Sequence, residues 1–168
     1  MYDLLMLAML LRGAKHGYQL KRETVTLVGG GRLHNNQVYP ALRRFVSNGW
    51  VTRRLVPGNR GQTRHLYSLT PRGRRELIAR LCRFTDEDAA NAASFWFRVG
   101  LFGLLQPEDR NRILHARETY LRARHAALTD VPASGSLDLY AGEVTSHVKT
   151  EIEAELGWIA RLRKTTNL

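Results

Sequence analysis

A single pair of β-forming runs, set among segments with helical patterning, most constrains how this chain of 168 residues folds. The runs, residues 50–56 and 64–69, flank a turn that contains Pro57, Gly58 and Gly61. Two short β-forming runs around a Gly- and Pro-rich turn predict a β-hairpin. The fold should therefore be mainly α-helical, with one small hairpin.

Three helices are expected before the hairpin and one directly after it. Residues 1–11 are apolar on nearly every side, so the first helix must be buried, in part against a second subunit. The second spans about 17–28, before a glycine-rich turn or loop at 29–35. In the third, which begins at Asn35 or Asn36, the 3.6-residue spacing predicts an inward stripe of Val38, Leu42 and Phe45. Asn48 and Gly49 end it, and Thr70 and Pro71 begin the fourth.

This order of elements is that of a winged helix-turn-helix, in which the third helix lies in the major groove of DNA. We expect two domains: a winged helix DNA-binding domain over residues 1–84 and a helical dimerisation and effector domain over 85–168. The second domain should contain one helix from Thr85 to about Leu105, another over 107–128, a linker at 130–136 and a last helix over 137–163.

Charge is divided unevenly between these two parts of the chain. Residues 1–85 contain 16 Lys and Arg against 3 Asp and Glu, whereas residues 86–168 contain 10 against 12. A strongly basic half joined to a nearly neutral one favours a polyanionic partner such as nucleic acid. The alternative is a basic surface that only aids solubility.

The outer face of the third helix has the chemistry for reading bases. At about 100° per residue, the side opposite the buried stripe carries Asn36, Pro40, Arg43 and Ser47. Arg favours guanine and Asn or Gln favours adenine. The residues on its flanks are Gln37, Tyr39 and Arg44, and the Tyr39 hydroxyl could donate to a phosphate.

The hairpin adds a second basic surface. Its cations are Arg53, Arg54, Arg60, Arg64 and His65, and its tip carries Arg60 and Gln62 beside glycine. Such a tip can enter a minor groove or lie along phosphates. We therefore predict double-stranded DNA as the partner. The residues expected to contact it are Lys15, His16, Tyr18, Asn36, Gln37, Tyr39, Pro40, Arg43, Arg44, Arg60, Gln62 and Arg64.

Other classes of function find little support in the sequence. The six histidines lack metal-ligand spacing, and no catalytic constellation stands out, so we expect neither metal, cofactor nor enzyme activity. Cys82 is the one cysteine and fits a small core residue. With no internal disulfide, no signal peptide and no membrane-spanning run, the chain is expected to be cytoplasmic.

Three adjacent aromatic residues, 95–97, cannot all face one side of a helix. The favoured interpretation is packing in a core or a dimer interface. A second interpretation is that one of them borders a cavity for a planar ligand. On that interpretation Trp96 and Trp158 would hold a small aromatic effector.

Four segments of the first half of the chain form a recognisable series: Lys15-His-Gly-Tyr-Gln-Leu, Val38-Tyr-Pro-Ala-Leu-Arg-Arg, Asn48-Gly-Trp-Val and His65-Leu-Tyr-Ser-Leu-Thr-Pro-Arg-Gly-Arg-Arg-Glu-Leu. In their order and spacing they resemble the PadR family of bacterial transcriptional regulators, over residues 4 to about 80. The resemblance implies a homodimer joined by C-terminal helices, and a repressor that often responds to a small molecule. The glycine-rich segment and Asn-Asn-Gln before the third helix depart from the family pattern, which leaves the base preference there open.

Together these features predict a homodimeric, sequence-specific repressor on a pseudo-palindromic operator. One alternative within DNA binding is a MarR-like winged helix, against which the Lys15-His-Gly-Tyr motif argues. An alternative of another class is a winged-helix module that docks on an acidic protein without specific operator binding.

Overall fold

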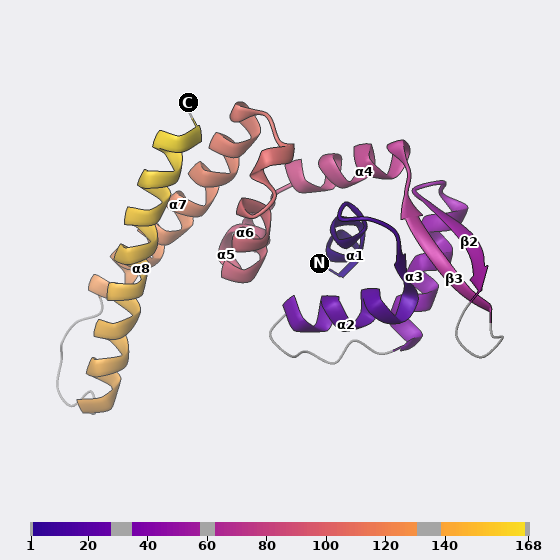
Figure 1. The fold of residues 1–168 in the computed structure, drawn as a ribbon. Helices are drawn as coiled ribbons and strands as arrows, with labels where there is room; N and C mark the ends of the chain where they lie inside the picture. Colours follow the sequence, from indigo (N-terminus) through magenta and orange to yellow (C-terminus); the bar gives the residue numbers. More distant parts are fainter. Residues whose placement is uncertain (1, 28–34, 58–62, 131–138, 167–168) are drawn as a thin grey trace. The chain divides into compact units, whose positions relative to one another are not determined.

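The computed structural model describes residues 2–27, 35–57, 63–130 and 139–166, in two compact units, Met1–Arg83 and Phe84–Leu168 (Figure 1). The elements of the first unit are α1 (Tyr2–Leu10), β1 (Lys15–His16), α2 (Gly17–Leu27), α3 (Asn35–Ser47), β2 (Val51–Pro57), β3 (Thr63–Leu69) and α4 (Pro71–Cys82). Those of the second are α5 (Asp86–Ala90), α6 (Ala92–Val99), the short 3-10 helix η2 (Phe102–Leu104), α7 (Pro107–Thr129) and α8 (Leu139–Thr166). The loop expected at 29–35 lies outside the described residues except for Asn35.

The first helix, α1, forms the centre of the first unit and contacts α2, α4 and β3 (Figure 1). Every residue from Leu4 to Leu10 is buried, as expected for a helix that is apolar all round. The inward stripe predicted for α3 is confirmed, because Val38, Leu42 and Phe45 are all fully buried. This packing leaves the opposite side of α3 facing outward.

The predicted hairpin is present and belongs to a three-stranded antiparallel sheet with strand order β1-β3-β2. In the β2–β3 pair Arg53 lies opposite Tyr67, and in the β1–β3 pair Lys15 lies opposite the same Tyr67. The two-residue strand β1 was not predicted from the sequence. It places the start of α2 beside the wing.

The junction between α3, the sheet and α4 depends on two glycines and a threonine. Gly49 has a φ of 69° where α3 ends, a backbone conformation that favours glycine. Thr70 caps α4 as predicted: its hydroxyl oxygen accepts a hydrogen bond from the Gly73 N–H at 2.9 Å and donates to the Gly49 carbonyl at 2.7 Å. A Cβ on Gly73 would lie 2.0 Å from the Trp50 carbonyl oxygen, so only glycine fits there.

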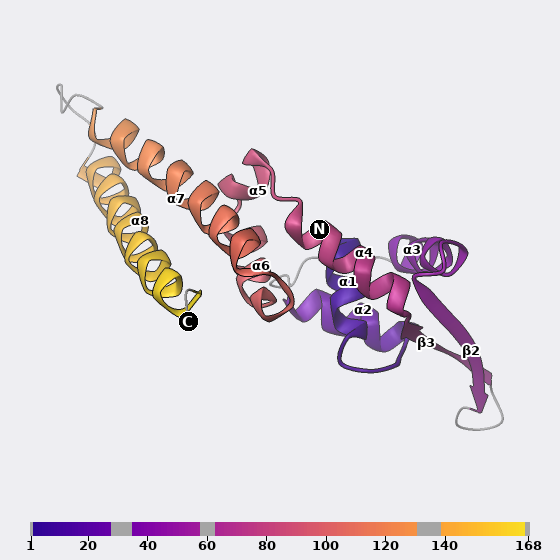
Figure 2. The same cartoon turned by 90° about the horizontal axis from the view of Figure 1, so that it is seen from above.

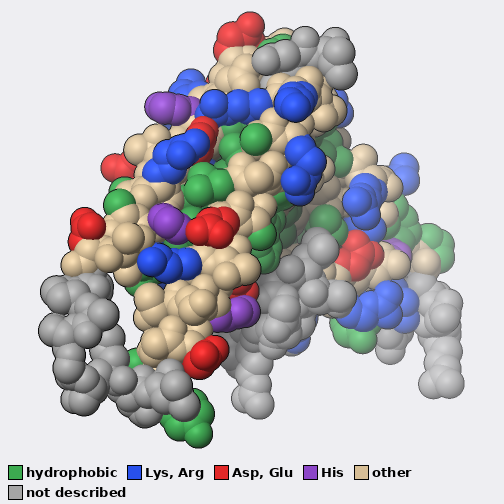
Figure 3. Space-filling model, turned by 90° about the vertical axis from the view of Figure 1, so that its left-hand side faces the viewer, with side chains coloured by type: hydrophobic (Ala, Val, Ile, Leu, Met, Phe, Trp, Pro, Cys, Tyr) green, Lys and Arg blue, Asp and Glu red, His purple; other side chains and the backbone are tan. Residues whose placement is uncertain are grey.

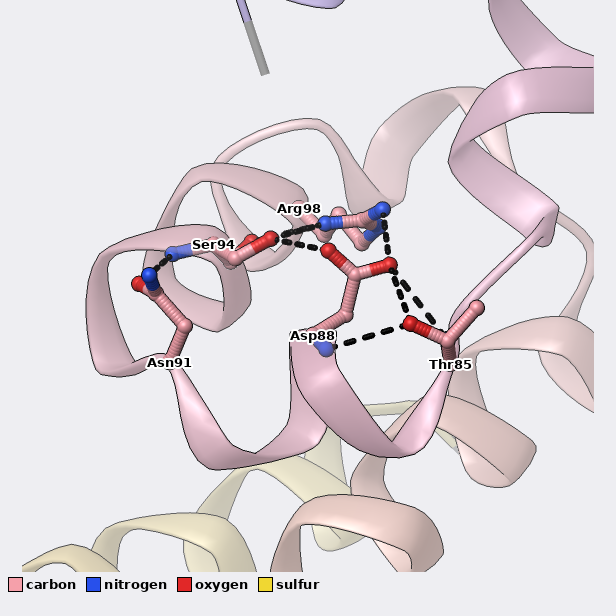
Figure 4. A network of polar contacts seen from close by, with 5 residues as sticks. All are labelled: Thr85, Asp88, Asn91, Ser94 and Arg98. Carbon is pink, nitrogen blue, oxygen red and sulfur yellow. Dashed lines mark hydrogen bonds and ion pairs between the residues drawn. The ribbon is translucent and has the colours of Figure 1, made fainter.

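The prediction of one helix from Thr85 to Leu105 is wrong. Thr85 begins α5 with a capping box, but α5 ends at Ala90. The Asn91 side chain then accepts a hydrogen bond from the Ser94 N–H at 3.0 Å and caps a new helix, α6 (Figure 4). An Asx cap that competes with helical hydrogen bonding explains the break.

Arg98 ties these two short helices together from α6. Its guanidinium donates to Asp88 of α5 at 2.9 Å and to the Ser94 hydroxyl and carbonyl (Figure 4). The Ser94 hydroxyl in turn donates to Asp88 at 2.6 Å. Asp88 and Arg98 therefore hold α5 and α6 in one arrangement.

The two long helices α7 and α8 pack side by side as an antiparallel pair (Figures 1 and 2). Both helices were predicted, and the described part of the last runs from Leu139 to Thr166, whereas its predicted start at 137 lies outside the described residues. The linker expected at 130–136 lies outside the described residues except for Asp130. Among the described helices, none combines the length and apolar character needed to cross a membrane.

Candidate DNA-binding surface and a cavity in the second unit

The outward side of α3 carries Pro40, Arg43 and Ser47, as the sequence predicted. Gln37, Arg43 and Ser47 are exposed, and Pro40 is half-buried. The side chain of Asn36 lies outside the described part of the chain. We call Pro40, Arg43 and Ser47 the outer face of α3, and exposed Gln37, Tyr39 and Arg44 lie on its flanks.

A groove runs between α3 and the wing beside this face. The residues that line it are Leu42, Arg43, Val46, Ser47, Arg53 and Tyr67. Tyr67 is only 5% exposed, and its burial raises the pKa of the phenol, an effect partly offset by Arg53 and Arg43. Two guanidiniums and a neutral phenol therefore meet in this groove.

A second hollow lies where β1 ends beside β3. The residues that line it are His16, Gly17, Tyr18, Tyr39, Arg64, His65 and Tyr67. A Cβ on Gly17 would lie 3.0 Å from the Tyr39 ring, so the start of α2 approaches α3 closely here. Tyr18 is 67% exposed and Tyr39 40%, which leaves both rings accessible. This hollow brings together Tyr18, Tyr39 and Arg64, which the sequence predicted as DNA contacts.

His16 fixes the start of α2. Its ring Nδ1 lies 3.0 Å from the His65 carbonyl oxygen, and its backbone N–H donates to the Gln19 side chain at 2.9 Å. The His-Gly-Tyr-Gln segment therefore forms the start of α2, and the contact between His16 and the His65 carbonyl attaches it to β3.

Tyr67 lines both the groove beside α3 and the hollow beside β1, and it was not among the predicted contacts. No alternation along β3 singles out Tyr67 for burial, and only the register with Arg53 shows its charged neighbour. Arg53 was noted as a wing cation but was not among the twelve predicted contacts.

The cations of the wing divide between the two faces of the ribbon. Side chains alternate along a strand, and the register places Arg53 and His65 on the face of Tyr67. Arg54 and Arg64 start from the opposite face. Arg60 and Gln62, the expected tip, lie outside the described residues.

Two predicted DNA contacts form ion pairs within the first unit instead of standing alone. Lys15 Nζ lies 2.9 Å from Glu23 of α2, with its side chain 17% exposed. Arg44 Nη2 lies 2.6 Å from Asp3 of α1. Lys15 and Arg44 thus differ from Arg43, which lines the groove beside the wing.

The second unit contains a cavity of about 540 Å³ between α6, α7 and α8. Trp96 and Trp158, far apart in sequence, both line it, together with Arg117, Arg124 and Glu155 among others. The Trp96 indole N–H donates to Glu155 at 3.3 Å, and the Phe95 and Trp158 rings meet edge to face at 5.9 Å. The structure therefore brings the two predicted effector residues to one cavity.

The surface of α7 and α8 mixes charges of both signs, as Figure 3 shows for one side of this unit. Its contacts include an ion pair between Arg122 and Glu118 at 2.7 Å and a hydrogen bond between the His125 ring and Glu153 at 3.0 Å. Within the described residues, no group of His, Cys, Asp and Glu is arranged to hold a metal ion. The strongly basic character is confined to the first unit.

Comparison with known proteins finds a family that matches most of the first unit. Residues 6–79 match the model of the transcriptional regulator PadR-like family, which confirms the resemblance seen in the motifs. The solved structures with similar folds include Bacillus subtilis PadR in complex with operator DNA, at 17% identity and a TM-score of 0.48 over 98% of each chain.

Two further solved structures are similar. A putative transcriptional regulator from Thermoplasma acidophilum is 24% identical, with a TM-score of 0.44 over 46% of this chain and 74% of that one. Bacillus subtilis PadR in complex with p-coumaric acid is 17% identical, with a TM-score of 0.40 over 99% and 98%. No curated protein matches the chain in sequence. The family consists of transcriptional regulators and not of enzymes.

With its buried first helix, exposed third helix and basic wing, the first unit is a winged helix that matches the transcriptional regulator PadR-like family over residues 6–79.

Proposed function

We propose that this chain is a homodimeric repressor that reads a pseudo-palindromic operator with α3. The observation that carries the proposal is the outer face of α3, where exposed Arg43 and Ser47 border a groove shared with Arg53 of the wing. Arg43 can bond guanine in the major groove, while wing cations contact phosphates. Half-site centres should lie about 10 bp, or a multiple of it, apart.

The test compares Arg43→Ala and Arg60→Ala in gel shifts on random DNA and on an operator. The operator is sought upstream of the gene that encodes this chain, as an inverted repeat to which the purified protein binds. Arg43→Ala should cost about 1–3 kcal/mol on the operator and relax base preference, whereas Arg60→Ala should weaken both DNAs alike. Arg74→Ala, an exposed arginine on α4, is the matched control. Equal losses on both DNAs for Arg43→Ala would remove its base-reading role.

The same measurements decide between a regulator and an interaction module. A steep salt slope with a specificity ratio of at least roughly 10³ supports the regulator. Weak binding that ignores sequence supports a module that docks on an acidic protein.

Exposed apolar side chains near the start of α8 support the dimer. Tyr140 is 74% exposed and Val144 62%, one turn apart on the helix. We propose that a second copy of the chain covers them. Replacing both with serine should lower the mass measured by sedimentation at a fixed concentration, while Glu143→Gln, an exposed neighbour, should not.

We further propose that the cavity lined by Trp96 and Trp158 holds a small aromatic effector whose binding releases DNA. The two indoles supply flat apolar walls, and exposed Arg124 supplies a cation for an acidic group. p-Coumaric acid, the compound bound to the Bacillus subtilis protein, is a suitable first probe. It should quench tryptophan fluorescence in the full chain and not in Trp96→Leu. DNA binding unchanged by the saturating compound would refute this effector.

A further inference from the structure

Carboxylates are scarce in the first unit, and each of them forms an ion pair with a Lys or Arg side chain. Against 16 Lys and Arg, residues 1–83 contain only Asp3, Glu23 and Glu76. Glu23 pairs with Lys15 at 2.9 Å, and Glu76 pairs with Arg80 one turn along α4 at 2.6 Å. Asp3 differs in reaching α3, where it pairs with Arg44 at 2.6 Å.

Arg44 lies where a helix in the major groove meets the DNA backbone. Its side chain projects roughly 70° from the centre of the outer face of α3, on the flank opposite Tyr39. Side chains on such a flank reach phosphates rather than base edges. The Arg44 side chain is 51% exposed, so its guanidinium is accessible while it lies on Asp3.

Asp3 is held from a second side. Arg80 Nη1 lies 3.7 Å from the same carboxylate oxygen that Arg44 contacts. The Arg80 guanidinium also stacks on the Trp50 ring at 4.8 Å and bonds to Glu76. If Asp3 moved outward together with Arg44, it would lose its contact with Arg80, which is held in place on α4.

We infer that Asp3 holds Arg44 away from DNA phosphate and so lowers the sequence-independent part of the affinity. The inference rests on the proposed DNA binding. Phosphate contacts add affinity without reading bases, and a carboxylate beside the DNA backbone also repels it. Withholding one such contact should weaken binding to random DNA and to the operator by the same factor, because the contact does not depend on sequence.

The experiment uses the full-length chain and a random-sequence duplex, with affinity measured by fluorescence anisotropy between about 50 and 200 mM salt. The variants are Asp3→Asn, Arg44→Gln and the double variant. Glu143→Gln, which removes one exposed carboxylate from α8, is the control for net charge. Circular dichroism and thermal melting verify that each variant is folded.

Asp3→Asn should bind random DNA more tightly and steepen the slope of log K against log salt by about 0.9, as expected for one added phosphate contact. Over a fourfold range of salt this slope change amounts to roughly 3.5-fold in affinity. Arg44→Gln alone should leave the slope unchanged, and in the double variant it should abolish the gain. Glu143→Gln should have no such effect.

Two results would overturn the inference. If Arg44→Gln alone flattens the slope by about 0.9, Arg44 already contacts phosphate in the wild type. If Asp3→Asn binds no more tightly than wild type, or more weakly, the carboxylate does not restrain Arg44. If the wild-type chain itself lacks salt-dependent binding to duplex DNA, the proposed function fails first.

Discussion

The guanidinium of Arg117 in α7 donates hydrogen bonds to both carboxylate oxygens of Glu155 in α8, with N–O distances of 3.0 and 2.8 Å. Both side chains are nearly buried, at 4% and 13% exposure. A third donor of Arg117 reaches the Ala89 carbonyl at 2.6 Å, so one residue joins α5, α7 and α8. Buried bidentate ion pairs of this kind fix the relative orientation of the two side chains in addition to neutralising their charges.

Glu155→Ala should therefore destabilise the second unit by about 3–5 kcal/mol, because it leaves a buried guanidinium without its counter-charge. The free energy of unfolding in urea measures this loss. Glu151→Ala removes an exposed carboxylate one turn earlier and should cost less than about 1 kcal/mol. Similar losses in the two variants would mean that the buried pair adds little to stability.

Gly73 permits the close approach of α4 to the sheet. A methyl group there would overlap the Trp50 carbonyl, a backbone atom that cannot rotate away, so Gly73→Ala should lower the melting temperature by several degrees or prevent folding. Gly142→Ala is the control, because it lies in α8 with open space around it. It should stabilise the chain by about 0.5–1 kcal/mol.

Asp88 links stability to acid pH. Its burial would raise the pKa of the carboxyl, but hydrogen bonds from Ser94 and Thr85 and the charge of Arg98 outweigh that effect and lower it. Because the pKa is lower in the folded chain, the unfolded chain binds more protons in acid. The stability that Asp88 contributes is therefore complete above its ordinary pKa, about 3.9, and is lost as pH falls through the lowered value.

Unfolding experiments between neutral pH and about pH 2 measure this dependence. Asp88→Asn should flatten the acid limb of the stability curve. Glu87→Gln, an exposed neighbour in the same turn, should retain it. A limb as steep in Asp88→Asn as in the wild type would assign the acid sensitivity to other groups.

Local pattern predicted much of this fold. The hairpin, the Thr70 cap and the inward face of α3 each depend on residues within a few positions of one another, so spacing alone identifies them. Features set by weak or competing local signals were missed. The two-residue strand β1 is too short to show an alternating pattern. The cap at Asn91 divides a segment whose helical pattern is continuous in the sequence.

The candidate site divides in the same way. Periodicity correctly placed Arg43 and Ser47 outward, because it reports the side of a helix on which a residue lies. It does not report tertiary partners. Asp3 is 41 residues from Arg44 in sequence, and Glu155 is 59 from Trp96, so only the fold shows that these pairs meet.

Tyr67 offers a further test of the DNA-binding surface. Because burial raises its pKa above the ordinary value, the phenol stays protonated near neutral pH and can donate to an anion. It lies between the groove that holds Arg43 and Arg53 and the hollow that holds Tyr18. Tyr67→Phe should keep the ring packing and remove this donor. We expect a loss of about 1.5 kcal/mol on operator and random DNA alike, as for one hydrogen bond to a charged phosphate.

Gel shifts on both DNAs check this, with Tyr120→Phe on α7 as the matched control. A loss confined to the operator would instead indicate that Tyr67 acts through Arg43, by fixing the guanidinium that reads a base. Unchanged affinity on both DNAs would mean that the phenol hydroxyl takes no part in binding. The two DNAs therefore separate a phosphate contact from a positioning role, because only the second depends on sequence.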